Sequence, residues 1–425
     1  MSDIAPSIDG EARPSSGSSA KVAEFRSHWR ALLAVVIGLS TGAASTLGYS
    51  HGALIGPLEA EYGWSRSYLS LGITAFGLAV LLGGARWGAL SDRFGARRVA
   101  VLSLLVYGTL LASAPDLIHL LPFWLIYFIT SIAGTGATAA ALTKPINDNF
   151  FAARGIALGV AFAGIGLGAF WVPLATQWLI EQGGWRFAYH ALGAMSFAAA
   201  PIVWFLLGPS ADAAATPAVT HAGKDELDGL TLHQAARTRT FWLLIILGTA
   251  LTLGIVGMTS HLIPLFHHAG ASPARAVAIA SILGLASMAA RLLVGFALDR
   301  ARGPIIAVLV PIVASAGILL LLPGPVTAPF AVLLIGLAFG SEIDMIAYFT
   351  SRYFGHREFG AIYGWMFGVF GISGGCASYL SGAIFDHFGS YHLAILACVS
   401  LTALAALLAT RLGPYRFETR HTVSH

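Results

Sequence analysis

Three ionisable side chains interrupt otherwise apolar stretches, where an uncompensated charge is costly. Arg291 lies within the stretch 274–297, and Glu342 and Asp344 lie within the stretch 327–350. A guanidinium group can hold a carboxylate through two parallel hydrogen bonds. Burial disfavours the charged form of a carboxyl group, which suits proton uptake, whereas a nearby arginine favours that form. These residues therefore predict an anion-binding group, Arg291, beside a proton carrier, Glu342 or Asp344.

The spacing of these residues indicates which of them can meet. Arg291 precedes Asp299 by eight residues, about 12 Å along a helix. Asp344 precedes Arg352 by the same number, so Arg291 and Asp344 should lie at similar depth. Glu342 and Asp344 are turned roughly 200° apart on a helix, so only one of them can face a shared cavity. The alternatives are that either acid neutralises Arg291 permanently, or that Arg291 forms a structural ion pair or reaches the membrane surface.

Four further side chains are candidates for substrate contact. Tyr348 follows the second of the two acids by four residues and so shares its helix face. Tyr49 and His51 end the first long apolar stretch, and His261 ends the seventh. Both histidines should therefore lie near the outer opening of a pathway through the membrane. Histidine changes its charge near neutral pH. Substrate binding or a response to pH is one interpretation of these histidines, and a structural hydrogen bond is the other.

Long apolar segments must position these side chains. Hydrophobic residues make up 56% of the 425 residues and charged residues only 10%, where soluble domains carry roughly 25%. Each segment has roughly the 18–25 residues that a helix needs to cross a bilayer, and no alternating barrel pattern is found. The sequence therefore predicts an all-α membrane protein with twelve transmembrane helices in a lipid bilayer. The segments fall near 31–53, 67–90, 98–114, 121–144, 155–180, 187–207, 240–265, 274–297, 304–323, 327–350, 359–383 and 391–411.

Charge and composition divide the chain into two halves. Most of the 24 Lys and Arg residues fall in the tails and in alternate loops, which predicts that both termini are cytoplasmic in the plasma or inner membrane. A long polar stretch after the sixth segment separates two six-helix bundles. The expected parts are a disordered tail at 1–30, an N-terminal bundle at 31–208, a linker at 209–238, a C-terminal bundle at 239–411 and a tail at 412–425.

A short charged cassette occurs once in each half. The first copy runs from Gly88 to Arg98 and the second from Gly295 to Gly303. A glycine at a helix end allows close packing, and an aspartate there can cap a helix or pair with an arginine. We expect a latch that forms in one arrangement of the bundles, and the alternative is that the arginines only fix the topology. The latch residues would be Gly88, Asp92, Arg93, Gly95, Arg97, Arg98, Asp299, Arg300 and Arg302.

This cassette gives the chain its resemblance to a known family. The pattern Gly-x-x-x-Asp-Arg-x-Gly-x-Arg-Arg after the second segment is similar to the commonest signature of the major facilitator superfamily. A degenerate copy follows the eighth segment, and the resemblance covers residues 30–411. It implies two pseudo-symmetric bundles that rock about a central substrate site, which then opens to one side of the membrane at a time.

Three stretches resemble the monocarboxylate and oxalate–formate branch of that superfamily. They are Glu61-Tyr-Gly-Trp-Ser-Arg-Ser67, the glycine-rich stretch from Arg154 to Gly168, and the stretch from Arg352 to Gly364. Members of the family often carry an aspartate one turn before the arginine of the eighth helix. Here Ser287 occupies that position ahead of Arg291, so the resemblance does not support proton coupling through such a pair.

These observations lead to one functional hypothesis and two rivals. We expect a secondary transporter, not an enzyme, that moves a small organic anion, first of all a monocarboxylate, by symport or antiport with protons as a candidate coupling ion. An exporter of amphipathic drugs or metabolites is the first rival, and a transport-dead sensor is the second. The sequence contains no nucleotide-binding, zinc-site or catalytic-triad pattern, so no cofactor or metal is expected. The cations form no patch, which argues against a nucleic-acid partner, and we expect a monomer.

Overall fold

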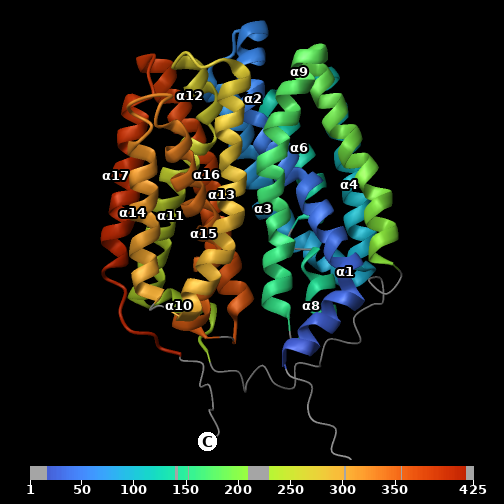
Figure 1. Cartoon of the computed structure of the whole chain (residues 1–425), viewed down its shortest axis with the longest axis vertical. Helices are drawn as coiled ribbons and strands as arrows, with labels where there is room; N and C mark the ends of the chain where they lie inside the picture. Colours follow the sequence, from blue (N-terminus) through green and yellow to red (C-terminus); the bar gives the residue numbers. More distant parts are fainter. Residues whose placement is uncertain are drawn as a thin grey trace, which may run out of the picture.

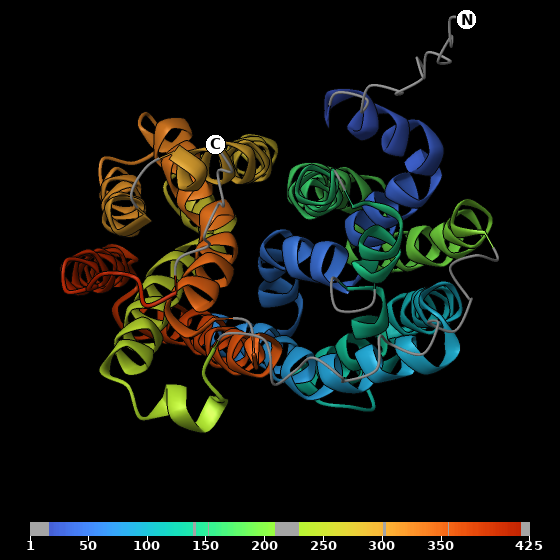
Figure 2. The same cartoon turned by 90° about the horizontal axis from the view of Figure 1, so that it is seen from below.

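The computed structural model describes residues 17–138, 142–151, 153–208, 229–300, 303–355 and 357–417. These residues form two helical bundles that stand side by side (Figure 1). The bundles are connected in sequence order, with one half of the chain in each. Figure 2 shows the same two bundles in a view along the helices.

The N-terminal bundle contains the helices from α1 to α9. The first two form one long rod that bends at Gly42, where a Cβ atom would lie 2.9 Å from the Ala137 carbonyl oxygen. Gly184 has φ 80, a left-handed conformation that glycine adopts without strain, and it divides α9 into two spans. The elements are α1 (Gly17–Thr41), α2 (Ala43–Tyr62), α3 (Arg66–Phe94), α4 (Ala96–Ala112), α5 (Ala114–Leu117), α6 (Phe123–Gly134), η1 (Thr135–Ala137), α8 (Lys144–Asn149) and α9 (Arg154–Leu207).

The C-terminal bundle contains the helices from α10 to α17. Its first rod also bends, because the chain leaves helical geometry between Ser260 and His261. The elements are α10 (Leu232–Ala236), α11 (Arg239–Thr259), α12 (Leu262–His268), α13 (Pro273–Arg300), α14 (Gly303–Leu319), α15 (Ala328–Phe354), α16 (Phe359–Phe388) and α17 (His392–Ala409).

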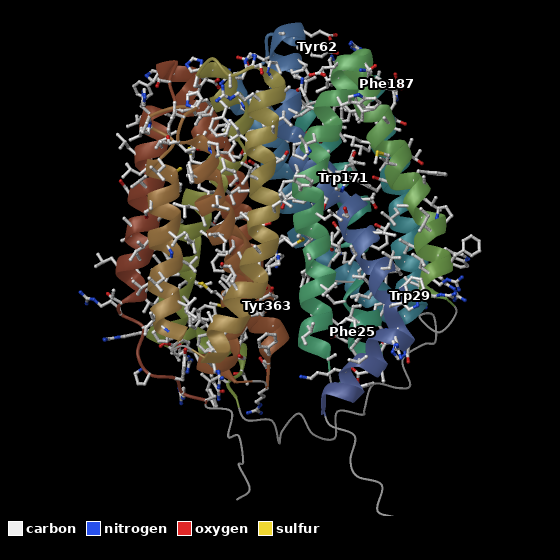
Figure 3. The ribbon with its side chains drawn as sticks, viewed as in Figure 1. Phe25, Trp29, Tyr62, Trp171, Phe187 and Tyr363 are labelled. Atoms are coloured by element: carbon white, nitrogen blue, oxygen red, sulfur yellow. The ribbon has the colours of Figure 1, made fainter. Side chains whose placement is uncertain are left out.

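The two ends of the molecule differ. We call the end at which α1 begins and α17 stops the terminal end, and the end at which α2 gives way to α3 the far end (Figure 1). Figure 3 shows Phe25 and Trp29 toward the terminal end, and Tyr62 and Phe187 at the far end.

Besides the short helices α5, α8 and α10, the described residues form twelve long helical rods, six in each bundle. Eight helical segments are long and apolar enough to cross a membrane, and one of them, Gly155–Leu207, holds the two spans on either side of Gly184. The shorter rods are Phe123–Ala137, Gly303–Leu319 and α4. The twelve-helix architecture predicted from the sequence is therefore confirmed.

Large apolar side chains cover much of the surface. Phe205 is 78% exposed, Phe330 is 68% exposed and Leu407 is 61% exposed. Exposed apolar area of this kind marks a surface that meets lipid or another apolar partner. A multi-pass membrane protein presents such side chains to lipid tails, which agrees with the low charge content of the sequence.

Part of the expected N-terminal tail is helical, and its residues 1–16 lie outside the described residues. Polarity predicts a disordered tail at residues 1–30, but α1 begins at Gly17. The Glu24 carboxylate accepts a hydrogen bond from the backbone N–H of Ala153, at 2.9 Å, one residue before α9 begins. This contact is made across the fold, so local polarity could not reveal it.

Parts of the expected linker and C-terminal tail also pack on the C-terminal bundle. α10 lies inside the linker expected at 209–238, and the Leu232 N–H donates to the Glu358 carboxylate at 2.7 Å. The Phe417 N–H donates to the Arg352 carbonyl oxygen at 3.0 Å. The remaining expected linker and tail residues, 209–228 and 418–425, lie outside the described residues.

Two pairs of helices make the most extensive contacts between the bundles. α3 packs along α16, and α9 packs along α13. Small residues bring the backbones together. A Cβ atom on Gly77 would lie 2.5 Å from the Gly371 carbonyl oxygen, and one on Gly284 would lie 2.5 Å from the Gly166 carbonyl oxygen. In each pair, the second span of one bundle packs against the fifth span of the other. The second spans are α3 and α13. The fifth spans are the first half of α9 and α16. A twofold rotation therefore exchanges the two pairs.

Candidate functional site

Arg291 lies on α13 at the interface between the two bundles. Its guanidinium carbon is 5.7 Å from the centroid of the Phe162 ring on α9. The Tyr49 hydroxyl of α2 is near enough to interact electrostatically with the same charge. Only 8% of Arg291 is exposed. The predicted anion ligand is therefore a buried cation that faces the opposite bundle.

The hydrogen bonding of Arg291 is incomplete. Its Nη1 atom lies 3.5 Å from Oδ1 of Asp344 on α15, at the long limit for a hydrogen bond. Its Nε atom is buried and has no hydrogen-bond partner among the described residues. A two-pronged arginine–carboxylate pair would use two N–H groups along one edge of the guanidinium, each at about 2.7–2.9 Å. Arg291 therefore has N–H groups that have no partner among the described residues and could donate to a ligand.

Asp344 supplies the carboxylate that is missing from α13. Ser287, one turn before Arg291, uses its hydroxyl to donate to the Gly284 carbonyl oxygen at 2.9 Å. The Asp344 side chain is 29% exposed, whereas that of Arg291 is 5% exposed. The Arg–Asp pair is therefore formed between two helices, and its acid is the more accessible member.

Glu342 lies on a different face of α15. Its carboxylate accepts a very short hydrogen bond from the Thr252 hydroxyl of α11. It lines a small, mostly apolar cavity inside the C-terminal bundle, together with side chains such as Met345 and Phe370. The two acids are thus separated, as their spacing on a helix requires, and Asp344 is the one beside Arg291.

Tyr363 of α16 belongs to the same site and is not among the residues predicted from the sequence. It interacts electrostatically with both Asp344 and Arg291. Figure 3 places it on the side of the C-terminal bundle that faces the N-terminal bundle. Its ring lies between those of Phe359 and Phe367, and this aromatic spacing of four residues was the signal available in the sequence.

The two tyrosines expected at the site have different positions. Tyr49 lies near Arg291, as described above. Tyr348 packs instead against Tyr415, with ring centroids 6.1 Å apart, and the guanidinium carbon of Arg352 lies 5.2 Å from its ring. A helix face shared with Asp344 does not bring Tyr348 to Arg291, because Tyr348 lies one turn closer to the terminal end.

Both candidate histidines are buried in the far half of the molecule. His51 Nδ1 lies 3.0 Å from the Tyr127 hydroxyl, inside the N-terminal bundle. His261 Nε2 donates to the Ser378 carbonyl oxygen at 2.9 Å and lies 3.2 Å from the Ser70 hydroxyl of the other bundle. These contacts differ from those of the Arg291 site, so the structure does not bring the histidines to it.

A second group of contacts, which we call the far-end clamp, consists of Arg66, Asp386 and Tyr391. The Asp386 carboxylate accepts the backbone N–H groups of Arg66 and Ser67 at 3.0 and 2.8 Å, so one bundle caps the first turn of α3 in the other. The Arg66 guanidinium donates to Tyr391 at 2.9 Å and to Glu59 at 3.2 Å.

Tyr391 extends the far-end clamp toward His261. Its hydroxyl lies 3.1 Å from His261 Nδ1. A tyrosine hydroxyl is protonated at neutral pH, because its pKa is ordinarily about 10. Tyr391 can therefore accept from Arg66 and donate to His261 at the same time, which links residues of both bundles in one chain of hydrogen bonds.

The cassette residues are described only in part. Arg97 donates to the Trp204 carbonyl oxygen at 2.9 Å and stacks on the Trp204 ring at 3.6 Å, both within the N-terminal bundle. Arg93 and Arg98 are exposed, and Gly95 has φ 91, which glycine favours at the α3–α4 turn. Gly88 leaves open space where a Cβ would lie. The side chains of Asp92, Asp299 and Arg300, and all of Arg302, lie outside the described residues, so the latch stays a prediction.

Comparison with known proteins agrees with this architecture. The family model of the Major Facilitator Superfamily matches residues 31–375. The Escherichia coli (strain K12) protein called uncharacterized MFS-type transporter YhjX is 26% identical over 363 residues, which cover 83% of this chain and 87% of that protein. Monocarboxylate transporter 13 of Bos taurus is 28% identical over 272 residues, which cover 63% of this chain and 61% of that protein.

Two solved structures share the fold. A D-xylose-proton symporter superposes with a TM-score of 0.67 over 91% of this chain and 98% of its own, at 15% identity. A bacterial homolog of the human lysosomal transporter Spinster gives a TM-score of 0.64 over 91% and 96%, also at 15% identity. Because the family model matches most of the chain and the twelve rods form two bundles related by a twofold rotation, the chain belongs to the Major Facilitator Superfamily.

Proposed function

We propose that the protein carries a small monocarboxylate across the membrane by alternating access, together with a proton. The observation that carries this proposal is the incomplete hydrogen bonding of Arg291 at the bundle interface. A carboxylate placed against Nε and one Nη atom would make the two parallel hydrogen bonds for which a guanidinium is shaped. Members of this family are transporters, so a ligand bound between the bundles is in the position of cargo.

Charge balance supports the coupling to a proton. Arg291 and Asp344, both ionised, carry no net charge together. A bound carboxylate adds one negative charge in a region where an uncompensated charge costs several kcal/mol. Protonation of Asp344 restores neutrality and frees the Nη1 atom that it contacts. One anion and one proton would therefore bind together, and their symport would move no net charge.

The name of one relative supports the proposed cargo. One is called a monocarboxylate transporter, at 28% identity. One solved structure of similar fold is called a proton symporter, although its cargo is a sugar. The substrate assignment for this chain thus rests on Arg291 and Asp344.

The present arrangement supports a site that opens at the terminal end. Along α3 and α16, Gly382 lies against Arg66 at the far end, and Gly368 lies against Leu81 farther along. The Asp386 carboxylate also joins the bundles at the far end, which supports access to the site from the terminal end. With both termini in the cytoplasm, as the distribution of cations predicts, this is a cytoplasm-facing form of a monomer in the plasma or inner membrane.

Reconstituted uptake tests this function. Purified protein in liposomes would be assayed with radiolabelled acetate, lactate and benzoate, with and without an imposed pH gradient. We expect uptake of at least one of these acids, driven by the gradient and lowered about 100-fold in Arg291→Ala. Arg275→Ala, an exposed arginine on the same helix, is the matched control and should keep the wild-type rate.

Two results would contradict the proposal. One is an Arg291→Ala variant that transports at the wild-type rate. The other is a wild-type protein that moves none of the acids but moves neutral or cationic amphipathic compounds, which would favour the rival function of an exporter.

A further inference from the structure

Three aromatic rings form a stripe along α16, and the middle one interacts electrostatically with Arg291. The rings of Phe359 and Tyr363 have centroids 5.7 Å apart and are tilted by 6°, and those of Tyr363 and Phe367 are 5.9 Å apart and tilted by 21°. The three residues are spaced by four, so they share one helix face. We call them the aromatic stripe.

The aromatic stripe is not part of the packed core of its own bundle. Ile362, Met366 and Phe370 of the same helix are 0%, 1% and 4% exposed and belong to the C-terminal core. The stripe residues lie one or three positions away from these and are only half-buried. Their rings therefore keep accessible area on a face that turns away from the centre of the bundle.

Aromatic side chains from both bundles lie near the guanidinium. Tyr363, in the middle of the stripe, interacts electrostatically with Arg291 and Asp344. Phe162, from the other bundle, has its ring centroid 5.7 Å from the guanidinium carbon. A ligand whose carboxylate binds Arg291 thus has ring faces within reach of the rest of its structure.

We propose that the cargo is an aromatic monocarboxylate, whose carboxylate binds Arg291 and whose ring lies against Tyr363 and Phe367. This inference rests on the proposed monocarboxylate transport and adds its substrate class. A ring gains both apolar burial and an offset or edge-to-face contact with the stripe. Acetate or lactate has no group that could make the second contact. The stripe would therefore select for the aromatic ring of the substrate, whereas Arg291 binds its carboxylate.

Parallel uptake measurements test the substrate class. Full-length protein in liposomes would be assayed with radiolabelled phenylacetate and acetate, which share the carboxylate and differ by the ring. We expect a KM for phenylacetate about tenfold lower than for acetate, the size of a favourable aromatic contact. In Phe367→Leu this advantage should disappear through a higher KM for phenylacetate, with acetate changed less than about twofold.

Control variants separate a loss of stacking from a loss of folding. Phe388→Leu removes an exposed ring at the far end of α16 and should keep the preference for phenylacetate. Tyr363→Phe keeps the ring and should keep it as well, whereas Tyr363→Leu should lower it. If the leucine variants do not fold, Tyr363→Phe together with competition by phenylacetate against acetate uptake in the wild type still measures the preference.

The outcomes distinguish this inference from the function on which it rests. Equal KM values for the two acids in the wild type, or an equal rise of both in Phe367→Leu, would overturn the aromatic substrate class and leave monocarboxylate transport intact. Uptake of neither acid would overturn both.

Discussion

Arg66 and Arg291 are both arginines held between the two bundles, but their donors are used very differently. The Arg66 guanidinium donates to Glu59 and Tyr391 and stacks on Phe385 at 3.7 Å. Arg291 has one contact at 3.5 Å and a buried Nε without a partner among the described residues. The first cation is satisfied by the protein itself, whereas the second retains donors that a ligand could take.

This difference separates a structural contact from a binding site. A buried donor without a partner costs roughly 1–3 kcal/mol, and more when the group is charged. Arg66 avoids this cost through neighbours from both bundles, which makes its contacts part of the closure at the far end. The Nε donor of Arg291 stays unpaired among the described residues in the present arrangement. A bound carboxylate could therefore form the hydrogen bond that the protein does not provide.

The largest expected effect comes from removing the unsatisfied cation. Arg291→Ala should lower kcat/KM for carboxylate uptake about 100-fold, because it removes a pair of charge-assisted hydrogen bonds. Arg291→Lys keeps the positive charge but cannot form two parallel hydrogen bonds, so kcat/KM should fall about tenfold. Initial uptake rates in liposomes measure both, and an equal loss in Arg66→Ala would mean that the two arginines do not differ in role.

The second effect concerns the two acids near the same depth. Asp344→Asn should abolish the response of uptake to a pH gradient while carboxylate exchange across the membrane continues, because the proton carrier is lost and the anion site remains. Glu342→Gln is the matched control, since Glu342 lies inside the C-terminal bundle and should leave the gradient response unchanged. Gradient-driven accumulation that persists in Asp344→Asn and fails in Glu342→Gln would reverse the assignment.

The third effect weakens the far-end clamp. Asp386→Asn removes the charge that caps α3 and should shift the population toward a form open at the far end by about five- to tenfold. A cysteine at Ser70, which is 0% exposed, reports this opening through its rate of labelling by a membrane-impermeant maleimide. The background needs Cys376→Ala and Cys398→Ala, and unchanged labelling would argue against a role for the cap.

The smallest effect on transport is expected inside the C-terminal bundle. Thr252→Val leaves the buried Glu342 carboxylate without its donor, which should destabilise the fold by about 1–3 kcal/mol. The melting temperature in detergent should fall by a few degrees, while uptake changes less than about twofold. A strong transport defect with an unchanged melting temperature would instead place Glu342 in the transport cycle.

The fold and the depth of the site could be predicted because they depend on regularities along single helices. Hydropathy located the twelve rods, and the equal offsets of Arg291 and Asp344 from the ends of their helices placed them at one level. The spacing of Glu342 and Asp344 required different faces. None of these inferences needs knowledge of how helices are arranged against one another.

The remaining features depend on tertiary contacts, which no local pattern encodes. The backbone cap by Asp386 exists only because α16 reaches the start of α3, far away in sequence. Tyr348 lies one turn closer to the terminal end than Asp344, and there Tyr415 of the C-terminal tail packs against it. The sequence could not decide which acid meets Arg291, since that choice depends on the rotation of α15 about its axis. Tyr363 was visible only as one of many aromatic residues in an apolar helix.

The glycine contact between α3 and α16 has a mechanical consequence. At Gly77 and Gly371 two backbones meet with no side chain between them. This contact can therefore act as a stiff pivot between the bundles. The lever arm from Gly77 to Arg66 is about 16 Å, and the arm from Gly77 to Phe94 is about 25 Å. A tilt that parts the far end by a given width would therefore draw the terminal end together by roughly one and a half times that width.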